Sequence, residues 1–187
     1  MTLLAVLRHG ETAWSAAGRI QGRTDVPLLP RSNLILPEVC RGMRVVTSPL
    51  RRCVETAALL GAPDAAQEPR IIEMDWGDWQ GESLAALRER LGEAMRDNEA
   101  RGLDFRPANG ESPREVRHRL KSWLREVAAT GEPTLAVTHR GVIRALFAEA
   151  TGWDMRGKPP ARLEWDAVQL FDLDAEGAPS IRQLNVR

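Results

Sequence analysis

Two short stretches of the sequence place histidine and arginine together directly after an apolar run. Residues 4–10 read LAVLRHG, and residues 135–141 read LAVTHRG. Each has the form of a buried strand that ends on a histidine, an arginine and a glycine. In an open α/β sheet, ligands bind outside the carboxyl ends of the strands. If the two strands are neighbours, four groups that can carry positive charge converge, and a phosphate group is the ligand that suits them best.

The rest of the chain alternates between strand-like runs and amphipathic helices. Helices are expected at residues 49–60, 83–98, 113–127 and 141–151; Ser48 is the expected N-cap of the first, and the third follows a capping box at Ser112. Strands are expected at residues 2–7, 45–47, 71–74, 135–138, 168–173 and 181–186, and the last two can pair as a hairpin. This alternation predicts an α/β protein, a three-layer α/β/α sandwich with a mostly parallel mixed sheet.

Length and composition limit the classes of protein that the chain can belong to. Its 187 residues are expected to form a single domain over residues 1–187. The 26 basic and 26 acidic residues balance, which argues against a nucleic-acid binder. No apolar run is long enough to span a membrane, and charges interrupt the first one too early for a signal peptide, so a cytoplasmic protein is expected. The two cysteines lack metal-ligand spacing, and the oligomeric state stays open.

The motifs, taken in order, resemble the histidine phosphatase superfamily, which includes phosphoglycerate mutases and small phosphomonoesterases. The resemblance covers most of the chain and rests on RHGET at residues 8–12, GRIQG at 18–22, SPL at 48–50 followed by Arg52 and Thr56, EMDWGDWQG at 73–81, GES at 110–112 and THRGVIR at 138–144. A lone RHG recurs by chance, whereas the ordered set is specific. The fold that the resemblance implies is phosphoglycerate mutase-like.

The resemblance implies metal-free phosphoryl transfer through His9. A neutral imidazole nitrogen attacks phosphorus to form a phosphohistidine, and an ordinary pKa of about 6.5 leaves much of the ring neutral at pH 7. Arg8, Arg52 and His139 are implied to hold the three equatorial oxygens, with no metal or other cofactor. Arg52 is preferred to Arg51 because the family places a small residue directly after this arginine.

A carboxylic acid must protonate the leaving group and later activate water. The resemblance assigns this role to Glu73, just before the GDWQG turn. Spacing alone does not separate Glu73 from Asp75, and Glu11 is a more distant competitor. The choice between the first two therefore stays open at the level of sequence.

Four further residues are expected to contact the substrate: Ser15, Gln21, Gly22 and Arg140. Arg140 replaces a glycine that usually follows the second histidine in the family. If it points into the mouth of the pocket, it favours substrates with a second anion; if it points to solvent, its removal changes little. Residues 29–43 are broken by prolines where the family has a regular helix, so this region is expected to be remodelled.

The expected function is hydrolysis of a small phosphorylated metabolite, with inorganic phosphate as a product. The shortness of the chain and the EMDWG motif favour a phosphatase over a mutase-type phosphotransferase, because mutases carry extra segments that shield the phosphoenzyme from water. A phospho-ligand binding protein without turnover is a second alternative. The identity of the metabolite stays open.

Overall fold

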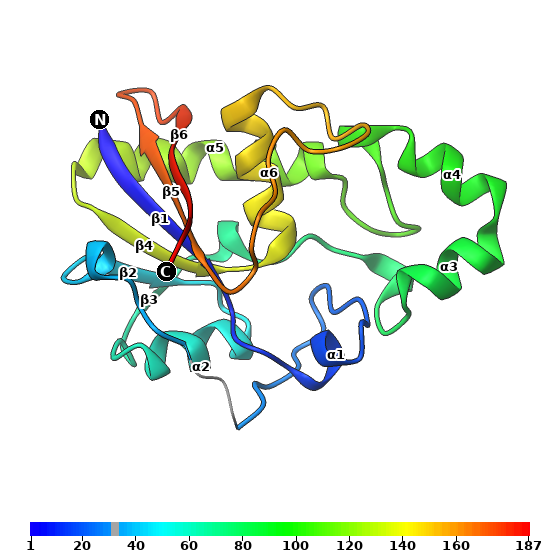
Figure 1. The fold of residues 1–187 in the computed structure, drawn as a ribbon, viewed down its shortest axis with the longest axis horizontal. Coiled ribbons are helices and arrows are strands. Elements are labelled where there is room, and N and C mark those ends of the chain that lie inside the picture. Colours follow the sequence, from blue (N-terminus) through cyan, green and yellow to red (C-terminus); the bar gives the residue numbers. More distant parts are fainter. Residues whose placement is uncertain (31–33) are drawn as a thin grey trace.

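Six strands build one mixed sheet in the computed structural model of the protein, which describes residues 1–30 and 34–187. The strands are β1 (Thr2–Arg8), β2 (Arg44–Thr47), β3 (Ala66–Gln67), β4 (Thr134–Thr138), β5 (Val168–Leu173) and β6 (Pro179–Val186). Their order across the sheet is β3-β2-β4-β1-β5-β6 (Figure 1). Strands β3, β2, β4 and β1 run parallel, whereas β5 is antiparallel to both β1 and β6. The expected mostly parallel sheet is confirmed, and so is the hairpin of its last two strands.

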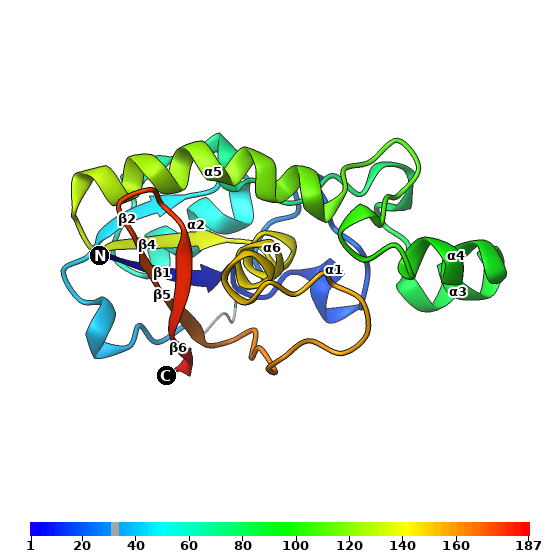
Figure 2. The ribbon, with the colours of Figure 1, turned by 90° about the horizontal axis from the view of Figure 1, so that it is seen from above.

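Helices cover both faces of this sheet. They are α1 (Ala13–Ala16), α2 (Arg51–Leu59), α3 (Leu84–Leu91), α4 (Glu93–Glu99), α5 (Pro113–Thr130) and α6 (Arg140–Thr151), with short 3-10 turns at Glu38–Cys40, Pro69–Ile71, Gly77–Trp79 and Gly102–Asp104. Helices α5 and α6 pack on one face and α2 on the other, which gives the expected three layers. Helices α3 and α4 extend away from the sheet at one end of the molecule (Figures 1 and 2). Within the described ranges, none of these helices is long and apolar enough to cross a lipid bilayer.

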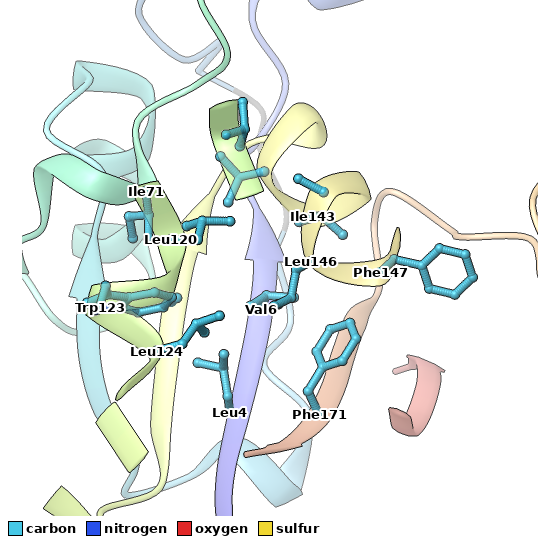
Figure 3. Packing of buried hydrophobic residues seen from close by; sticks show 14 of the residues in the cluster. Leu4, Val6, Ile71, Leu120, Trp123, Leu124, Ile143, Leu146, Phe147 and Phe171 are labelled. Carbon is cyan, nitrogen blue, oxygen red and sulfur yellow. The ribbon is translucent and has the colours of Figure 1, made fainter. Parts of the chain in front are cut away.

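Strand β1 lies in the middle of the core because both of its faces are covered. Successive side chains of a strand point to opposite faces. Leu4 and Val6 pack against the layer of α5 and α6 (Figure 3), whereas Ala5 and Leu7 belong to a cluster on the other face. A strand that is buried on both faces reads as a continuous apolar run, which explains the LLAVL stretch before Arg8.

The register between β1 and β4 brings the two histidine-containing stretches together. The strands are parallel neighbours, and Arg8 lies opposite Thr138. His9 and His139 therefore leave the sheet at the same edge and at the same level. The backbone N–H of His9 donates to the carbonyl oxygen of Thr138 at 2.9 Å, which fixes their spacing.

The helix expected over residues 83–98 is wrong in its extent, because two helices occupy this stretch. Helix α3 ends and α4 begins at Gly92, whose φ is +54°. This left-handed backbone ends a helix, and glycine adopts it at no steric cost. The apolar spacing still indicates the packing, since Leu87 and Met95 are buried in one cluster with Trp79.

Residues 71–74 form no strand, so that prediction is also wrong. The carbonyl oxygens of Arg70 and Ile72 accept hydrogen bonds from the guanidinium of Arg119. Because a side chain satisfies these carbonyl groups, they do not take part in a strand ladder. The edge strand is β3 instead, which pairs with β2.

Helix α2 begins at Arg51 instead of Pro49, and the expected N-cap is wrong. Its N-cap residue is Leu50, which makes no side-chain capping bond. The hydroxyl of Ser48 lies 2.7 Å from Nε2 of His139 instead. A fully buried imidazole needs a polar partner, and Ser48 supplies it at short distance while its Oγ accepts the backbone N–H of Leu50 only at 3.4 Å.

The stretch expected to be remodelled, residues 29–43, is only partly described. Residues 31–33 lie outside the described part of the chain. Over residues 34–43 the structure has a single regular element, the 3-10 turn at Glu38–Cys40. A long amphipathic helix is therefore absent from residues 34–43, in agreement with the prolines of this segment.

Candidate active site

The side chains of His9 and His139 lie side by side at the carboxyl edge of the sheet. Their ring centroids are 5.3 Å apart. Only 4% of His9 is exposed, and His139 is fully buried. Two imidazole rings at this separation can contact one small ligand together, as the repeated strand-end pattern predicts.

The ring of His9 is held in one tautomer by its own loop. Its Nδ1 atom lies 2.7 Å from the carbonyl oxygen of Gly10. A carbonyl oxygen only accepts hydrogen bonds, so Nδ1 carries the proton and Nε2 keeps its lone pair. Burial, followed by the charges of Arg52 and Arg8, lowers the pKa of His9 well below the usual 6.5. The ring is therefore neutral near pH 7, and Nε2 is available as a nucleophile.

The ring of His139 is neutral as well, and two side chains from the region of α2 hold it. Its Nε2 atom lies 2.7 Å from Oγ of Ser48 and 3.4 Å from Sγ of Cys53. Burial, followed by the charge of Arg52, lowers the pKa of His139 well below 6.5. Burial also raises the pKa of the Cys53 thiol, which therefore stays protonated and unreactive.

Arg52 is a fully buried cation that backbone carbonyl groups position. Its Nη1 donates to the carbonyl oxygen of Thr24 at 2.8 Å, and its Nη2 donates to that of Gly22 at 2.7 Å. The hydroxyl of Thr56 donates to the carbonyl oxygen of Arg52 and accepts the N–H of Gly10 at 2.9 Å. These hydrogen bonds connect α2 to the chain that follows β1. Gly22 contributes to the site by accepting a hydrogen bond from Arg52.

Two guanidinium N–H groups in this pocket lack a partner. Among the buried side-chain nitrogen and oxygen atoms of the described residues, Nε of Arg8 and Nε of Arg52 are the two without a hydrogen bond. An unsatisfied buried donor costs roughly 1–3 kcal/mol, and more when it is charged. Phosphate oxygens are suitable acceptors. Arg51, by contrast, is exposed and pairs with Glu55 at 2.6 Å, as expected.

Glu73 reaches the same pocket from the segment between β3 and α3. Its Oε1 accepts the backbone N–H groups of Met74 at 2.8 Å and Gly141 at 3.1 Å. Burial raises the pKa of Glu73 and so favours the protonated acid. Asp75 lies outside the pocket, where its carboxylate is 3.5 Å from Arg23 and 32% of its side chain is exposed. Of the two carboxylates that sequence spacing leaves equivalent, Glu73 is the buried one.

The first turn of α6 packs closely against the pocket. A Cβ atom on Gly141 would overlap with Oε1 of Glu73, so only glycine allows the carboxylate to approach this backbone. Arg140, the first residue of α6, has its Cζ 4.6 Å from the ring centre of Trp165. The side chain of Arg140 is therefore packed on an aromatic face at the edge of the site.

Two arginines that sequence patterns do not single out hold the backbone around Glu73. Arg119 on α5 donates to the carbonyl oxygen of Ile72 at 2.6 Å, and Arg23 donates to that of Glu73 at 3.3 Å. Glu111 accepts hydrogen bonds from both guanidinium groups. Arg119 lies on the mostly apolar face of its helix, and a charge there is the sequence signal that could have indicated a buried polar partner.

A cavity of about 680 Å³ adjoins His9. Ser15 lies on its wall, and its hydroxyl donates to the carbonyl oxygen of Thr12 at 3.1 Å. The amide oxygen of Gln21 accepts a hydrogen bond from the Thr12 hydroxyl at 2.6 Å. Both side chains thus stabilise the turn that follows β1, and Ser15 is the one placed on the cavity wall.

Comparison with known proteins identifies the family of this chain. Residues 4–187 match the family model of the histidine phosphatase superfamily (branch 1). The chain belongs to this superfamily.

Individual proteins agree with this assignment. The chain is 31% identical over 172 residues to a metal-independent phosphoserine phosphatase of Arabidopsis thaliana, covering 84% of this chain and 72% of the relative. It is 34% identical over 174 residues to a glucosyl-3-phosphoglycerate phosphatase of Mycolicibacterium vanbaalenii, covering 80% and 74%. The solved structure of Bacillus stearothermophilus YhfR has the same fold, with a TM-score of 0.82, 24% sequence identity and coverage of 100% of this chain and 98% of that one. The expected family, fold and enzyme class, a phosphoric monoester hydrolase, are confirmed.

Proposed function

We propose that this protein hydrolyses phosphomonoesters of small metabolites without a metal ion, through a phosphohistidine formed on His9. The observation that carries the proposal is the hydrogen bond from Nδ1 of His9 to the carbonyl oxygen of Gly10, since it leaves Nε2 unprotonated near Arg8 and Arg52. A fixed neutral imidazole is a suitable nucleophile for phosphoryl transfer, and the adjoining cations suit the transferred group. The products are an alcohol and inorganic phosphate.

In the first step, the lone pair of His9 Nε2 attacks phosphorus while the bond to the ester oxygen breaks. Arg8, Arg52 and His139 hold the equatorial oxygens, whose charge must be stabilised throughout the transfer. The unpartnered Nε–H groups of the two arginines supply donors for these oxygens. Glu73, whose protonated form burial favours, gives its proton to the leaving oxygen. The alcohol departs, and phosphorus is bonded to Nε2.

In the second step, water replaces the histidine. Glu73 is now a carboxylate, and it takes a proton from the attacking water. The water oxygen bonds to phosphorus, the phosphorus–nitrogen bond breaks, and its electron pair returns to Nε2 of His9. Inorganic phosphate then leaves, and both side chains have regained their starting protonation states.

Phosphotransfer of the mutase type is the main alternative, and it requires a phosphoenzyme that is protected from water. The cavity beside His9 has exposed residues on its wall, among them Glu11, Arg162 and Asp166, so water has access to it. This access favours hydrolysis. Binding without turnover, the second alternative, needs no buried acid, whereas the raised pKa of Glu73 is typical of a catalytic group.

We expect the purified protein to hydrolyse 4-nitrophenyl phosphate at an unchanged rate in the presence of EDTA. The positive charges that a metal would otherwise supply come from Arg8 and Arg52, and a chelator removes neither. Release of nitrophenolate with and without EDTA measures this. Loss of activity on chelation, restored by a divalent cation, would contradict the metal-free mechanism. Tight binding of inorganic phosphate without any turnover would favour the non-catalytic alternative.

The dependence of kcat/KM on pH is expected to be bell-shaped for an alkyl phosphate. The ordinary pKa values of histidine and glutamate, 6.5 and 4.5, lie in the wrong order for His9 as nucleophile and Glu73 as acid. Burial lowers the pKa of His9 and raises that of Glu73, and both shifts favour a pH range in which His9 is neutral and Glu73 is protonated. Activity should fall as pH drops through the lowered pKa of His9 and as pH rises through the raised pKa of Glu73.

Initial rates in a series of buffers across this range measure the two limbs. Glu73→Gln should remove the alkaline limb and retain the acidic one, which identifies the group responsible for each. An acidic limb with a pKa of 6.5 or higher would contradict the lowered pKa assigned to His9.

A further inference from the structure

Arg140 occupies the position after the second histidine, and an aromatic ring holds it there. Its Cζ lies 4.6 Å from the ring centre of Trp165, a distance at which cation–π attraction keeps a guanidinium over an indole face. Trp165 lines the cavity that adjoins His9. Stacking covers one face of the guanidinium and leaves the N–H groups at its edge available for an anion.

Arg140 and Arg8 carry like charges that repel one another. Among the charged groups around Arg8, Arg140 lowers its pKa the most, second only to burial. Glu73 is the single acidic group that acts on Arg140 in the described part of the chain, and no hydrogen-bonded carboxylate contributes there. Like charges repel one another, and an anion bound between them relieves the repulsion.

Three arginines carry the positive charge near the two histidines. Both histidines are neutral, and Glu73 is protonated when it acts as the acid. Arg8, Arg52 and Arg140 are the cations near them, while Glu11, Glu164 and Asp166 line the wall of the cavity beside His9. Of the three arginines, Arg140 is the most exposed, so its charge lies furthest toward solvent.

We propose that Arg140, backed by Trp165, binds a second anionic group of the substrate, so that the preferred substrates are small phosphomonoesters that also carry a carboxylate or a further phosphate. This proposal rests on the proposed function, because Arg140 selects among substrates only if the enzyme turns them over. Arg140 begins α6, and Trp165 lies in the segment before β5. The two residues are distant in the sequence, and the packing of the fold places their side chains in contact.

Arg144 and Trp153 repeat the same arrangement one turn further along α6 and provide a matched control. The Cζ of Arg144 lies 5.2 Å from the ring centre of Trp153, which packs edge-on against Phe147. Trp153, unlike Trp165, is not among the residues that line the cavity beside His9. Removing Arg144 thus deletes the same charge and the same kind of ring contact, but against a ring that does not line the cavity.

The test compares 3-phosphoglycerate with glycerol 3-phosphate, which differ by a carboxylate in place of a hydroxymethyl group. The ratio of their kcat/KM values should favour 3-phosphoglycerate in the native protein and fall about tenfold in Arg140→Gln, as expected for the loss of one charge-assisted contact. Trp165→Leu should lower the ratio in the same direction by less. Arg144→Gln should leave the ratio and both rates unchanged.

A second pair of substrates distinguishes the two possible anions. Propane-1,3-diol bisphosphate and 3-hydroxypropyl phosphate make the same comparison for a second phosphate. The pair whose ratio of kcat/KM values falls further in Arg140→Gln identifies the group that Arg140 binds. Hydrolysis by this variant of the two compounds that carry a phosphate as their one anionic group, glycerol 3-phosphate and 3-hydroxypropyl phosphate, also shows that it is folded.

Three outcomes would overturn the second anion site and leave the hydrolase mechanism standing. They are an unchanged ratio in Arg140→Gln, an equal fall in Arg144→Gln, and hydrolysis of 4-nitrophenyl phosphate by a native protein that prefers neither doubly anionic compound. Failure of the native protein to hydrolyse any of these esters would instead reject the proposed function, and the second anion site with it.

Discussion

Replacing His9 by alanine is expected to abolish turnover and the covalent phosphoenzyme together. The other imidazole in the pocket, His139, has its Nε2 atom occupied by Oγ of Ser48 at 2.7 Å, so kcat should fall by at least about 10⁴-fold. Brief mixing of the native protein with a radiolabelled phosphomonoester, followed by denaturation, should leave label on the protein. That label should be labile in acid and stable in base, as a phosphohistidine is, and it should be absent from His9→Ala.

His118→Ala is the matched control for this substitution. His118 is exposed on α5, so its loss should affect neither turnover nor labelling. Label that survives acid would point to an ester of serine or threonine, and label that persists in His9→Ala would show that a different group is the nucleophile.

Replacing Glu73 by glutamine is expected to lower kcat/KM for an alkyl phosphate by about 10²–10⁴-fold, the usual contribution of a general acid. Oε1 of the new amide can still accept the N–H groups of Met74 and Gly141, so the local structure should be retained. For 4-nitrophenyl phosphate the fall should be less than about tenfold, because its leaving group departs without a proton. The contrast between the two substrates isolates proton donation from substrate binding.

The same variant separates the two duties of Glu73. Without a base to activate water, Glu73→Gln should release a rapid burst of nitrophenolate and then turn over slowly as the phosphohistidine accumulates. Asp75→Asn should have mild effects on every one of these measurements, since its carboxylate pairs with Arg23 outside the pocket. If the two variants exchanged their behaviour, Asp75 would be the proton donor.

The position of the candidate site at two strand ends could be predicted from the sequence, because a short sequence pattern coincides with a general rule about where α/β sheets bind ligands. An apolar run followed by histidine, arginine and glycine occurs twice, and ligands bind at the carboxyl ends of parallel strands. The prediction needs only that the strands be neighbours, which the pairing of Arg8 with Thr138 satisfies. The capping box at Ser112 is local too, and both of its hydrogen bonds form. Features that a few adjacent residues decide are accessible to sequence reasoning.

Contacts between distant segments could not be predicted in this way. Ser48 before Pro49 is a good helix start, yet the closer partner of its hydroxyl is the buried ring of His139, far along the chain, and α2 begins only at Arg51. The carbonyl groups around residues 71–74 are likewise satisfied by Arg119 from α5, which removes the expected strand. In both places a side chain from another element outcompetes the local preference, and only the packed fold determines which interaction forms.

The backbone hydrogen bond from His9 to Thr138 makes the catalytic spacing part of the folding transition itself. Strands β1 and β4 are central in the sheet, and their apolar side chains are almost entirely inaccessible to solvent. Elements of this kind open only with the whole cooperative unit. The spacing between the two imidazole rings is therefore lost only when the whole domain unfolds. A substitution elsewhere that lowers the free energy of unfolding reduces the fraction of folded, active molecules, and the molecules that remain folded keep the same pocket. Heat inactivates such an enzyme by unfolding it, and not by loosening its active site.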